Sequence, residues 1–304
     1  MKEKYLIVII GPTAIGKTTL AIDVATHYNT EIISADSRQF FKEMAIGTAV
    51  PSSDELLKVK HHFIQHKSIK DSYSVGDFER DAIAKLDSLF KHQDIVVMVG
   101  GSGLYVDAVL NGLDSFPTVP ADIRNQLNER FRNEGLPVLQ HMLKRLDPEY
   151  YLRVDVANPH RLIRALEICV GTGRSYSSFL SQPKIRRNFV SHSIGLQADR
   201  DIIYTRINQR VDEMMRCGLL LEAEKLLPYK KFNALQTVGY KELFGYFEGK
   251  YPLEVAVEEI KKNTRRFAKR QITWFKKTPQ THWFAYNDSS TKILSEINTK
   301  IQST

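Results

Sequence analysis

Two glycines, a lysine and a threonine near the amino end of the chain have a spacing that can bind phosphate. Gly11 and Gly16 are separated by four residues, and Lys17 and Thr18 follow at once. Glycine allows the backbone angles that turn successive N–H groups inward, where they bind phosphate oxygens together with the lysine charge. The threonine hydroxyl can bind a magnesium ion that the phosphates share. We therefore predict a phosphate-binding loop (P-loop) made of Gly11, Pro12, Thr13, Ala14, Ile15, Gly16, Lys17 and Thr18.

A carboxylate follows the next apolar run and is the first candidate for chemistry beside that phosphate. Residues 31–36, EIISAD, end on Asp36, and Ser37, Arg38 and Gln39 come directly after it. Ligands of open α/β sheets bind beyond the carboxyl ends of the strands, so we expect this stretch to face the same crevice as the P-loop. Asp36 is then a magnesium ligand, a general base or the cap of the next turn, and we favour function over capping.

The third apolar run ends in glycines and a serine instead of an acid. Residues 95–99, IVVMV, lead into Gly100, Gly101 and Ser102. An ATPase or GTPase would place an aspartate at the end of such a strand to hold the magnesium ion of the nucleotide. The missing acid counts against that class, and the glycines suit close approach by a ligand backbone or phosphate at a helix start.

The spacing of apolar residues predicts the elements that position these motifs. Strand patterns alternate with amphipathic helices outside residues 117–187, and inside that range only helical patterns occur. We predict an α/β fold, a P-loop NTPase-like parallel sheet flanked by helices, whose core is 1–116 with 188–304 and whose helical insertion is 117–187. The strands are expected at 5–10, 31–36, 95–99 and 188–197, and the helices at 73–90, 201–227 and 253–277.

Positive charge is concentrated in two parts of the chain. The formal net charge is +8 and the pI is about 9.3; residues 120–190 hold twelve Lys/Arg against seven Asp/Glu, and residues 255–280 hold eight against two. In the first region a helix is expected to begin at Asn158-Pro159 and to end at Gly171, with Arg161 and Arg164 on one face. Localised basic surface is what nucleic-acid binding needs, since arginines near a helix start can bind backbone phosphates.

Two further arginines are predicted to act at the P-loop. Arg206 and Arg210 are one turn apart on the segment 201–227. If this face points into the crevice, Arg210 reaches the same phosphates as Lys17, which is a usual geometry for stabilising a leaving phosphate or diphosphate.

Several classes of protein are disfavoured by the sequence. We expect no secretory signal, because a strand starts at once, and no membrane span, because no apolar run is long enough. Cys169 and Cys217 fit no metal or redox spacing, which favours reduced thiols in the cytoplasm. The histidines at 61, 62 and 66 have no carboxylate or cysteine at ligand spacing, so a structural or substrate-loop role is expected for them.

Taken together, these motifs resemble one family, the tRNA dimethylallyltransferases, the isopentenyl-tRNA transferases of the P-loop class. They occur in the order of the family over nearly the whole chain. The matching stretches are GPTAIGKT at 11–18, DSRQ at 36–39, MAIGTAVP at 44–51, HHF at 61–63, YSVGDF at 73–78, GGSGLY at 100–105, NPHRLIRALE at 158–167, RINQR at 206–210, VGYKEL at 238–243 and RRFAKRQITWF at 265–275.

The resemblance implies a reaction and its partners. A dimethylallyl group passes from dimethylallyl diphosphate to the exocyclic amine of the adenine beside the tRNA anticodon, and that adenine is flipped out of its stack. The expected partners are the tRNA anticodon stem-loop and dimethylallyl diphosphate, with Mg²⁺ as cofactor, in a cytoplasmic monomer. No zinc-finger extension is seen at the carboxyl end, as in bacterial members. A diphosphate leaving group also explains a P-loop without the acid of an NTPase.

The resemblance also assigns roles to residues. Asp36 looks like the general base, Thr13, Lys17, Thr18 and Arg210 look like the diphosphate and magnesium site, and Ser102 completes the catalytic set. Ser37, Arg38 and Gln39 would hold the flipped adenine. The expected tRNA contacts are Asp36, Ser37, Arg38, Gln39, Ser102, Arg124, His160, Arg161, Leu162, Ile163, Arg164, Gln236, Gly239, Tyr240 and Lys241.

Four positions depart from the family pattern, and two other functions stay open. Ser102 replaces a usual threonine, His160 a usual glutamine, and Glu43 and Ala45 a frequent glycine and aspartate.

The first alternative function is a P-loop kinase of a small molecule, which would turn over ATP without RNA. The second is a tRNA-binding protein without catalysis, whose RNA binding would not change on Asp36→Ala and which would form no product.

Overall fold

The chain divides into two compact units, of which the second is inserted into the first. The structure is a computed structural model that describes residues 3–180, 186–278 and 280–302. Contacts group Met1–Asn111 with Arg187–Thr304 in unit 1, and Gly112–Arg186 form unit 2. The second unit is thus shifted by a few residues from the predicted range 117–187. Arg187 shows why, because its guanidinium donates to the carbonyls of Ala108 and Val109 at 2.7 and 2.9 Å and pairs with Glu79 at 2.6 Å, all in unit 1.

The predicted parallel sheet is confirmed in unit 1. Its strand order is β3-β2-β4-β1-β5-β6, and every neighbouring pair is parallel. Two edge strands were missing from the sequence prediction, because two and four residues are too few for a periodic pattern. The strands are β1 Tyr5–Ile10, β2 Ile32–Ser34, β3 His61–His62, β4 Ile95–Gly100, β5 Val190–Gln197 and β6 His282–Ala285.

Helices surround this sheet. The prediction of one segment over 201–227 is wrong, since Gly218, with φ of +99°, separates two helices there, and the last helix of the chain had not been predicted. The helices of unit 1 are α1 Lys17–His27, α2 Ser53–Lys58, α3 Val75–Leu89, α4 Gly103–Asn111, α9 Arg200–Arg216, α10 Leu219–Leu226, α11 Tyr240–Phe247, α12 Leu253–Phe275 and α13 Ser290–Gln302.

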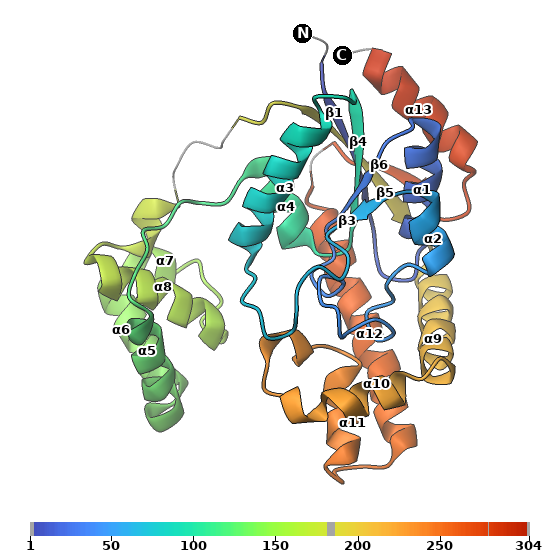
Figure 1. The fold of residues 1–304 in the computed structure, drawn as a ribbon. Helices are drawn as coiled ribbons and strands as arrows, with labels where there is room; N and C mark the ends of the chain where they lie inside the picture. The colour runs from blue at the N-terminus through green and yellow to red at the C-terminus, as the bar shows by residue number, and fades with distance from the viewer. Residues whose placement is uncertain (1–2, 181–185, 279, 303–304) are drawn as a thin grey trace. The chain divides into compact units, whose positions relative to one another are not determined.

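Helices cover both faces of the sheet (Figure 1), and alternate residues of the central strand belong to two different cores. Leu6 and Val8 of β1 pack in one core with side chains of α3 and α4. Ile7 and Ile9 pack in a second core with side chains of α1 and α13. A strand that is buried on both sides reads as a continuous apolar run, which is why YLIVII was recognisable as the centre of the sheet. Both cores hold the strands that end at the candidate site.

Unit 2 is helical, as the sequence predicts. Its core contains Leu127, Leu139, Leu143 and Leu166. The last helix begins where it was expected, with the Asn158 side chain accepting the N–H of Arg161 at 3.3 Å. The helices are α5 Ala121–Glu134, α6 Leu136–Leu146, α7 Pro148–Tyr151 and α8 Pro159–Thr172.

The predicted end of α8 at Gly171 is wrong. The helix ends at Gly173, whose φ of +68° is the left-handed conformation that glycine adopts without strain. Gly171 lies inside the last turn, where a Cβ would approach Val119 Cγ1 to 2.5 Å, so this glycine serves close packing.

None of the helices in the described parts of the chain is long and apolar enough to cross a membrane.

Candidate active site

The P-loop leaves β1 and enters α1 through two glycines that are required for different reasons. At Gly11, with φ of +148°, a Cβ would lie 2.7 Å from the carbonyl oxygen of Leu196. At Gly16 a Cβ would meet nothing within 4 Å, and the φ of +108° alone favours glycine. Helix α1 then begins at Lys17. The local geometry is therefore that of a strand, a glycine turn and a helix N-terminus, the arrangement that binds phosphate.

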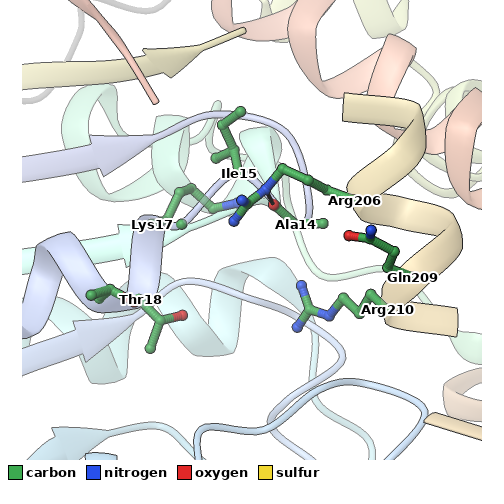
Figure 2. Close-up of a pocket in the computed structure, with 9 residues that line it drawn as sticks. Ala14, Ile15, Lys17, Thr18, Arg206, Gln209 and Arg210 are labelled. Carbon is green, nitrogen blue, oxygen red and sulfur yellow. Dashed lines mark hydrogen bonds between the residues drawn. The ribbon is translucent and has the colours of Figure 1, made fainter. Parts of the chain in front are cut away.

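A cavity of about 350 Å³ lies between this loop and α9, and we call it the P-loop cavity. In Figure 2, Arg206, Gln209 and Arg210 project from α9 toward the loop. Arg206 Nε donates to the carbonyl of Ala14 at 2.7 Å, and Arg210 lies 3.5 Å from the Thr13 hydroxyl. The cavity is lined by Ala14, Ile15, Gly16, Lys17, Thr18, Thr19, Arg206, Gln209 and Arg210.

Lys17 is half-buried at this cavity, and its charge is sensitive to the surroundings. Its Nζ donates to the carbonyl of Pro12 at 2.7 Å. Burial lowers the pKa of Lys17 from 10.5 to about 8; Asp36 opposes this fall and Arg210 adds to it. Lys17, Asp36 and Arg210 are thus electrostatic neighbours. A bound polyanion would favour the protonated lysine.

A second and larger cavity, of about 1110 Å³, contains Asp36, and we call it the Asp36 cavity. Asp36 Oδ1 accepts the N–H of Arg38 at 3.1 Å, so one carboxylate oxygen does hold the following turn. The carboxylate as a whole nevertheless lines the cavity, together with Ser37, Arg38 and Ser102. Arg210 lines both cavities. Arg210 therefore borders both the cavity of the P-loop, which follows β1, and the cavity of Asp36, which follows β2.

Ser102 is tied directly to the segment that carries Asp36. Its Oγ accepts the N–H of Ser37 at 3.0 Å, and the two serine hydroxyls lie 3.1 Å apart. A threonine at position 102 would offer the same oxygen, so the departure from the family pattern keeps this contact.

Gln39 supports the wall of the Asp36 cavity. Its Nε2 donates to the carbonyls of Thr48 and Ala49 at 3.2 and 2.9 Å. Thr48 and Ala49 line the cavity, whereas Gln39 is not among its lining residues. The amide nitrogen of Gln39 thus holds the loop at 48–49, and a contact of Gln39 with the flipped adenine stays a prediction.

Arg38 remains at the cavity. It lines the space and donates through NH1 to the carbonyls of Asn233 and Ala234 at 3.3 and 3.1 Å. Arg38 thus ties the segment after β2 to the chain that leads into Gln236, Gly239 and Lys241, all three of which line the same cavity.

The sequence reasoning missed Glu222, which organises the loop at 45–47. Its carboxylate accepts the N–H groups of Ala45, Ile46 and Gly47 at 3.0, 2.8 and 2.9 Å, and the Tyr240 hydroxyl at 2.6 Å. Only the backbone of Ala45 is used, so its departure from the family pattern leaves this contact intact. Tyr240, predicted to bind tRNA, is fully buried, and burial together with Glu222 raises its pKa. The Tyr240 side chain thus supports the loop from inside, and a contact of this residue with tRNA stays a prediction.

The departure at Glu43 also has a structural role. Its carboxylate accepts the Ser68 hydroxyl at 2.6 Å and the N–H of Ile69 at 3.0 Å. The residue therefore holds the loop after β3 and lines neither cavity.

In unit 2, the predicted arginines share one carboxylate. Arg124 and Arg164 each lie 3.0 Å from the same oxygen of Glu167, and their side chains are 47% and 42% exposed. A single buried acid thus orients two half-exposed guanidiniums.

The predicted residues at the start of α8 differ in exposure. His160 and Arg161 are exposed. Leu162 and Ile163 are 0% and 3% exposed and their side chains belong to the core of unit 2, while the contact of the stretch 160–164 with tRNA stays a prediction.

The donor groups at the P-loop fit a magnesium ion that is held mainly by its substrate. Thr18 lines the P-loop cavity, and its hydroxyl is a hard oxygen donor of the kind that Mg²⁺ prefers. Within residues 3–180, 186–278 and 280–302, no group of three or more His, Cys, Asp and Glu could hold a metal ion.

Known proteins that share the whole length of the chain are enzymes of one kind. The model of the family described as IPP transferase matches residues 39–278. The tRNA dimethylallyltransferase of Christiangramia forsetii is 62% identical over 98% of this chain and 99% of its own length. That of Bacteroides fragilis is 45% identical over 99% and 100%.

Solved structures agree with these sequence relatives. The full-length tRNA isopentenylpyrophosphate transferase from Bacillus halodurans superposes with a TM-score of 0.74 at 35% identity, covering 99% of this chain and 98% of its own. A eukaryotic dimethylallyltransferase acting on tRNA superposes with a TM-score of 0.86 at 25% identity, covering 99% and 80%. The parallel sheet and its helices are thus shared with both.

Proposed function

The chain belongs to the IPP transferase family of tRNA dimethylallyltransferases, and on that premise we propose that it moves a dimethylallyl group from dimethylallyl diphosphate to the exocyclic N6 amine of the adenosine 3′ to the tRNA anticodon. The supporting observation is that Arg210 lines both the P-loop cavity and the Asp36 cavity. A group that is bound as a diphosphate on one side of Arg210 is thereby within reach of an acceptor on the other side. Diphosphate is the second product.

The acceptor amine reacts beside Asp36. As the N6 nitrogen bonds to the allylic carbon, the bond from that carbon to the diphosphate oxygen breaks, and its electron pair leaves with the diphosphate. The proton lost by the amine passes to the Asp36 carboxylate, whose Oδ1 is already oriented by the N–H of Arg38 at 3.1 Å. An oriented carboxylate within reach of the amine is a general base.

The departing diphosphate is stabilised by positive charge and N–H groups around the P-loop cavity. Lys17, Arg206 and Arg210 line this cavity with the N-terminus of α1. Because the groups are held before the reaction, they stabilise the developing charge without reorganising. A bound Mg²⁺, held by Thr18, would neutralise further charge on the diphosphate.

Transfer RNA is recognised by both units. In unit 1, Arg38, Gln236, Gly239 and Lys241 line the Asp36 cavity, where the flipped adenosine is placed. In unit 2, Arg124 and Arg164 are oriented by Glu167 for contact with backbone phosphates. Both cavities belong to one chain, which supports action as a monomer, and we place the protein in the cytoplasm with its tRNA substrate.

The test is a transfer reaction with defined components. Purified protein, Mg²⁺, dimethylallyl diphosphate and an unmodified anticodon stem-loop are mixed, and the RNA is examined by mass spectrometry. We expect one five-carbon addition, lost when the target adenosine is replaced and when Mg²⁺ is chelated. Formation of ADP from ATP in a parallel tube, with no addition to the RNA, would instead indicate the kinase alternative.

A further inference from the structure

Gln271 of α12 is a buried amide that joins the two loops of the site. It is one of the few polar side chains buried in the described chain, at 5% exposure. Its Oε1 accepts the N–H of Thr13 at 2.8 Å, and its Nε2 donates to the carbonyl of Gly101 at 2.8 Å. A backbone N–H can only donate and a carbonyl can only accept, so these two contacts fix the orientation of the amide.

The loops after β1 and β4 take different paths beyond this point. β1 and β4 are parallel neighbours, and their last paired residues are Ile10 and Gly100. Beyond that pair the chain after β1 forms the P-loop and enters α1, while the chain after β4 enters α4. Gln271 is inserted where the ladder of strand hydrogen bonds ends, and it supplies partners for one backbone group from each loop.

The Gln271 side chain fits beside residue 101 because glycine has no Cβ. A Cβ at position 101 would clash with Gln271 Nε2 and would come within 3.8 Å of Asp36 Oδ2. The glycine therefore lets the amide approach the backbone, and the contact lies at the edge of the Asp36 carboxylate.

Each loop that Gln271 holds carries one half of the proposed reaction. Thr13 lies 3.5 Å from Arg210 on the diphosphate side. Ser102, the residue after Gly101, accepts the N–H of Ser37 at 3.0 Å on the acceptor side. We infer that Gln271 is a positioning residue that sets the separation between the diphosphate and the acceptor amine. The inference rests on the proposed function and concerns the transfer step rather than the binding of either substrate.

The effect of losing this link is expected in the rate of transfer. In Gln271→Met a side chain of similar length fills the space without a donor or acceptor, so the loops can relax relative to each other. A misplacement of about 1 Å can slow a reaction by about 100-fold. We expect the single-turnover transfer rate to fall by about 10- to 100-fold, while the dissociation constants for stem-loop RNA and for dimethylallyl diphosphate change by less than about threefold.

Gln271→Glu adds a signature that a general loss of structure would not produce. The protonated carboxyl can donate to Gly101 and accept from Thr13, whereas the carboxylate has no proton for the Gly101 carbonyl. The transfer rate of this variant divided by that of the unmodified protein should therefore rise as pH falls. A new carboxylate also shifts the pKa values of its charged neighbours, so the full pH profile of each protein is fitted before the ratio is taken. The charged groups that line the same cavity are Asp36, Arg38, Arg210, Lys241, Glu242, Glu259 and Arg270.

The experiment measures single-turnover transfer, both dissociation constants and thermal unfolding for the two variants, with Gln93→Met as the matched control. Gln93 is a partly buried amide that accepts the Thr30 hydroxyl at 2.7 Å, and it lines neither cavity. We expect the control to transfer at the unmodified rate. Should Gln271→Met fail to fold, the pH dependence of the Gln271→Glu ratio decides alone.

Two results would overturn the inference. The first is an unchanged transfer rate in folded Gln271→Met, or a pH-independent ratio for Gln271→Glu. The second is a loss that appears in RNA affinity alone, which would make Gln271 an RNA contact. Failure of the unmodified protein to transfer at all would be a failure of the proposed function instead, and it is read in the same assay before any variant is compared.

Discussion

The hydroxyl oxygens of Ser37 and Ser102 lie 3.1 Å apart, and Ser102 Oγ also accepts the N–H of Ser37 at 3.0 Å. One serine thus fixes both the backbone and the side chain of the residue that follows Asp36. The loops after β2 and β4 are joined by this pair in the same way that Gln271 joins the loops after β1 and β4. The position of Asp36 therefore depends on a hydroxyl at residue 102.

Removing that hydroxyl should slow transfer. In Ser102→Ala the partly buried N–H of Ser37 loses its acceptor, and a lost hydrogen bond costs about 0.5–1.5 kcal/mol. We expect a transfer rate about tenfold lower, measured in single turnover with saturating RNA. Ser102→Thr keeps the oxygen and should stay within about threefold of the unmodified protein. Equal rates for the alanine and threonine variants would show that the hydroxyl has no part in positioning Asp36.

Asp36→Asn should show whether Asp36 takes up the proton of the amine or only holds the turn that contains Arg38. The asparagine carbonyl can still accept the N–H of Arg38, which Asp36 Oδ1 accepts at 3.1 Å, but it cannot take a proton from the amine. We expect turnover to fall by about two to four orders of magnitude, as for loss of a general base, with RNA affinity kept. The rate is followed by incorporation of labelled dimethylallyl groups and the affinity by filter binding. Turnover within a factor of three of normal would remove Asp36 from the proton transfer.

The lowered pKa of Lys17 predicts how diphosphate binding depends on pH. In the free protein this pKa is about 8, so Lys17 loses its proton between pH 7 and 9. A bound diphosphate favours the ammonium form and raises the pKa, so binding takes up a proton and weakens as pH rises. We expect the dissociation constant to increase by about tenfold between pH 7 and 9. Calorimetry in buffers of different ionisation enthalpy measures the proton uptake.

Lys17→Arg provides the control for that experiment. A guanidinium stays protonated throughout this range, so the variant should bind diphosphate with little change between pH 7 and 9. The same pH dependence in both proteins would assign it to the ligand and not to Lys17.

Arg124 and Arg164 should affect RNA binding through charge. Each contacts the same oxygen of Glu167 at 3.0 Å and keeps nearly half of its side chain exposed. If each neutralises one phosphate, Arg124→Ala or Arg164→Ala should weaken binding and reduce the salt slope by about one. Arg153→Ala is the matched control, since Arg153 is an exposed arginine of unit 2 that pairs with Glu149 at 2.8 Å. A similar slope for all three variants would mean that Glu167 holds its arginines for the fold of unit 2.

His66 should make the protein sensitive to acid. Its ring lies edge-on to Phe40, Phe63 and Tyr73, and both ring nitrogens are buried without a hydrogen-bond partner within the described residues. Burial, and to a smaller extent the charges of Lys67 and Lys42, lower its pKa from 6.5 to about 4. Between those values the unfolded chain binds a proton that the folded protein does not, so the free energy of unfolding falls as pH falls from about 6.5 to about 4.

Thermal unfolding between pH 7 and pH 4.5 tests this effect. We expect His66→Leu to lose less stability over this range than the unmodified protein does. His92→Gln, a change at an exposed histidine, serves as the control and should follow the unmodified protein. If His66→Leu and the unmodified protein lost stability equally as pH falls, the sensitivity to acid would come from groups other than His66.

The parts of the site that could be predicted are those that depend on residues close together in the sequence. Gly11, Gly16 and Lys17 are read from one loop, because backbone freedom and charge are properties of neighbouring residues. The strands β1 and β4 were equally clear, since burial on both faces demands an unbroken apolar run. Ser102 could be placed beside Asp36 from the rule that carboxyl ends of parallel strands meet at one edge.

Glu222 and Gln271 could not be found in this way. Glu222 contacts the backbone of residues 45–47, at least 175 positions away along the chain, and Gln271 contacts Thr13 and Gly101, which are 258 and 170 positions away. In the sequence Glu222 stands within an amphipathic helix pattern and Gln271 within a basic one, where a polar residue predicts only a solvated surface. The burial of the Tyr240 side chain could not be predicted for a related reason, since a motif marks the position of a residue without telling which way its side chain points.

The order of strands has a consequence for how the enzyme is made on the ribosome. β1 is the first strand to leave the ribosome, but its neighbours β4 and β5 follow only at residues 95–100 and 190–197. Unit 2 is synthesised after β4 and before β5, so it can fold while the central strand still lacks its second neighbour. The last link between the two catalytic loops, Gln271, is added near the end of synthesis. A nascent chain that has released its P-loop and Asp36 therefore still lacks β5 and Gln271, two parts of the assembled site.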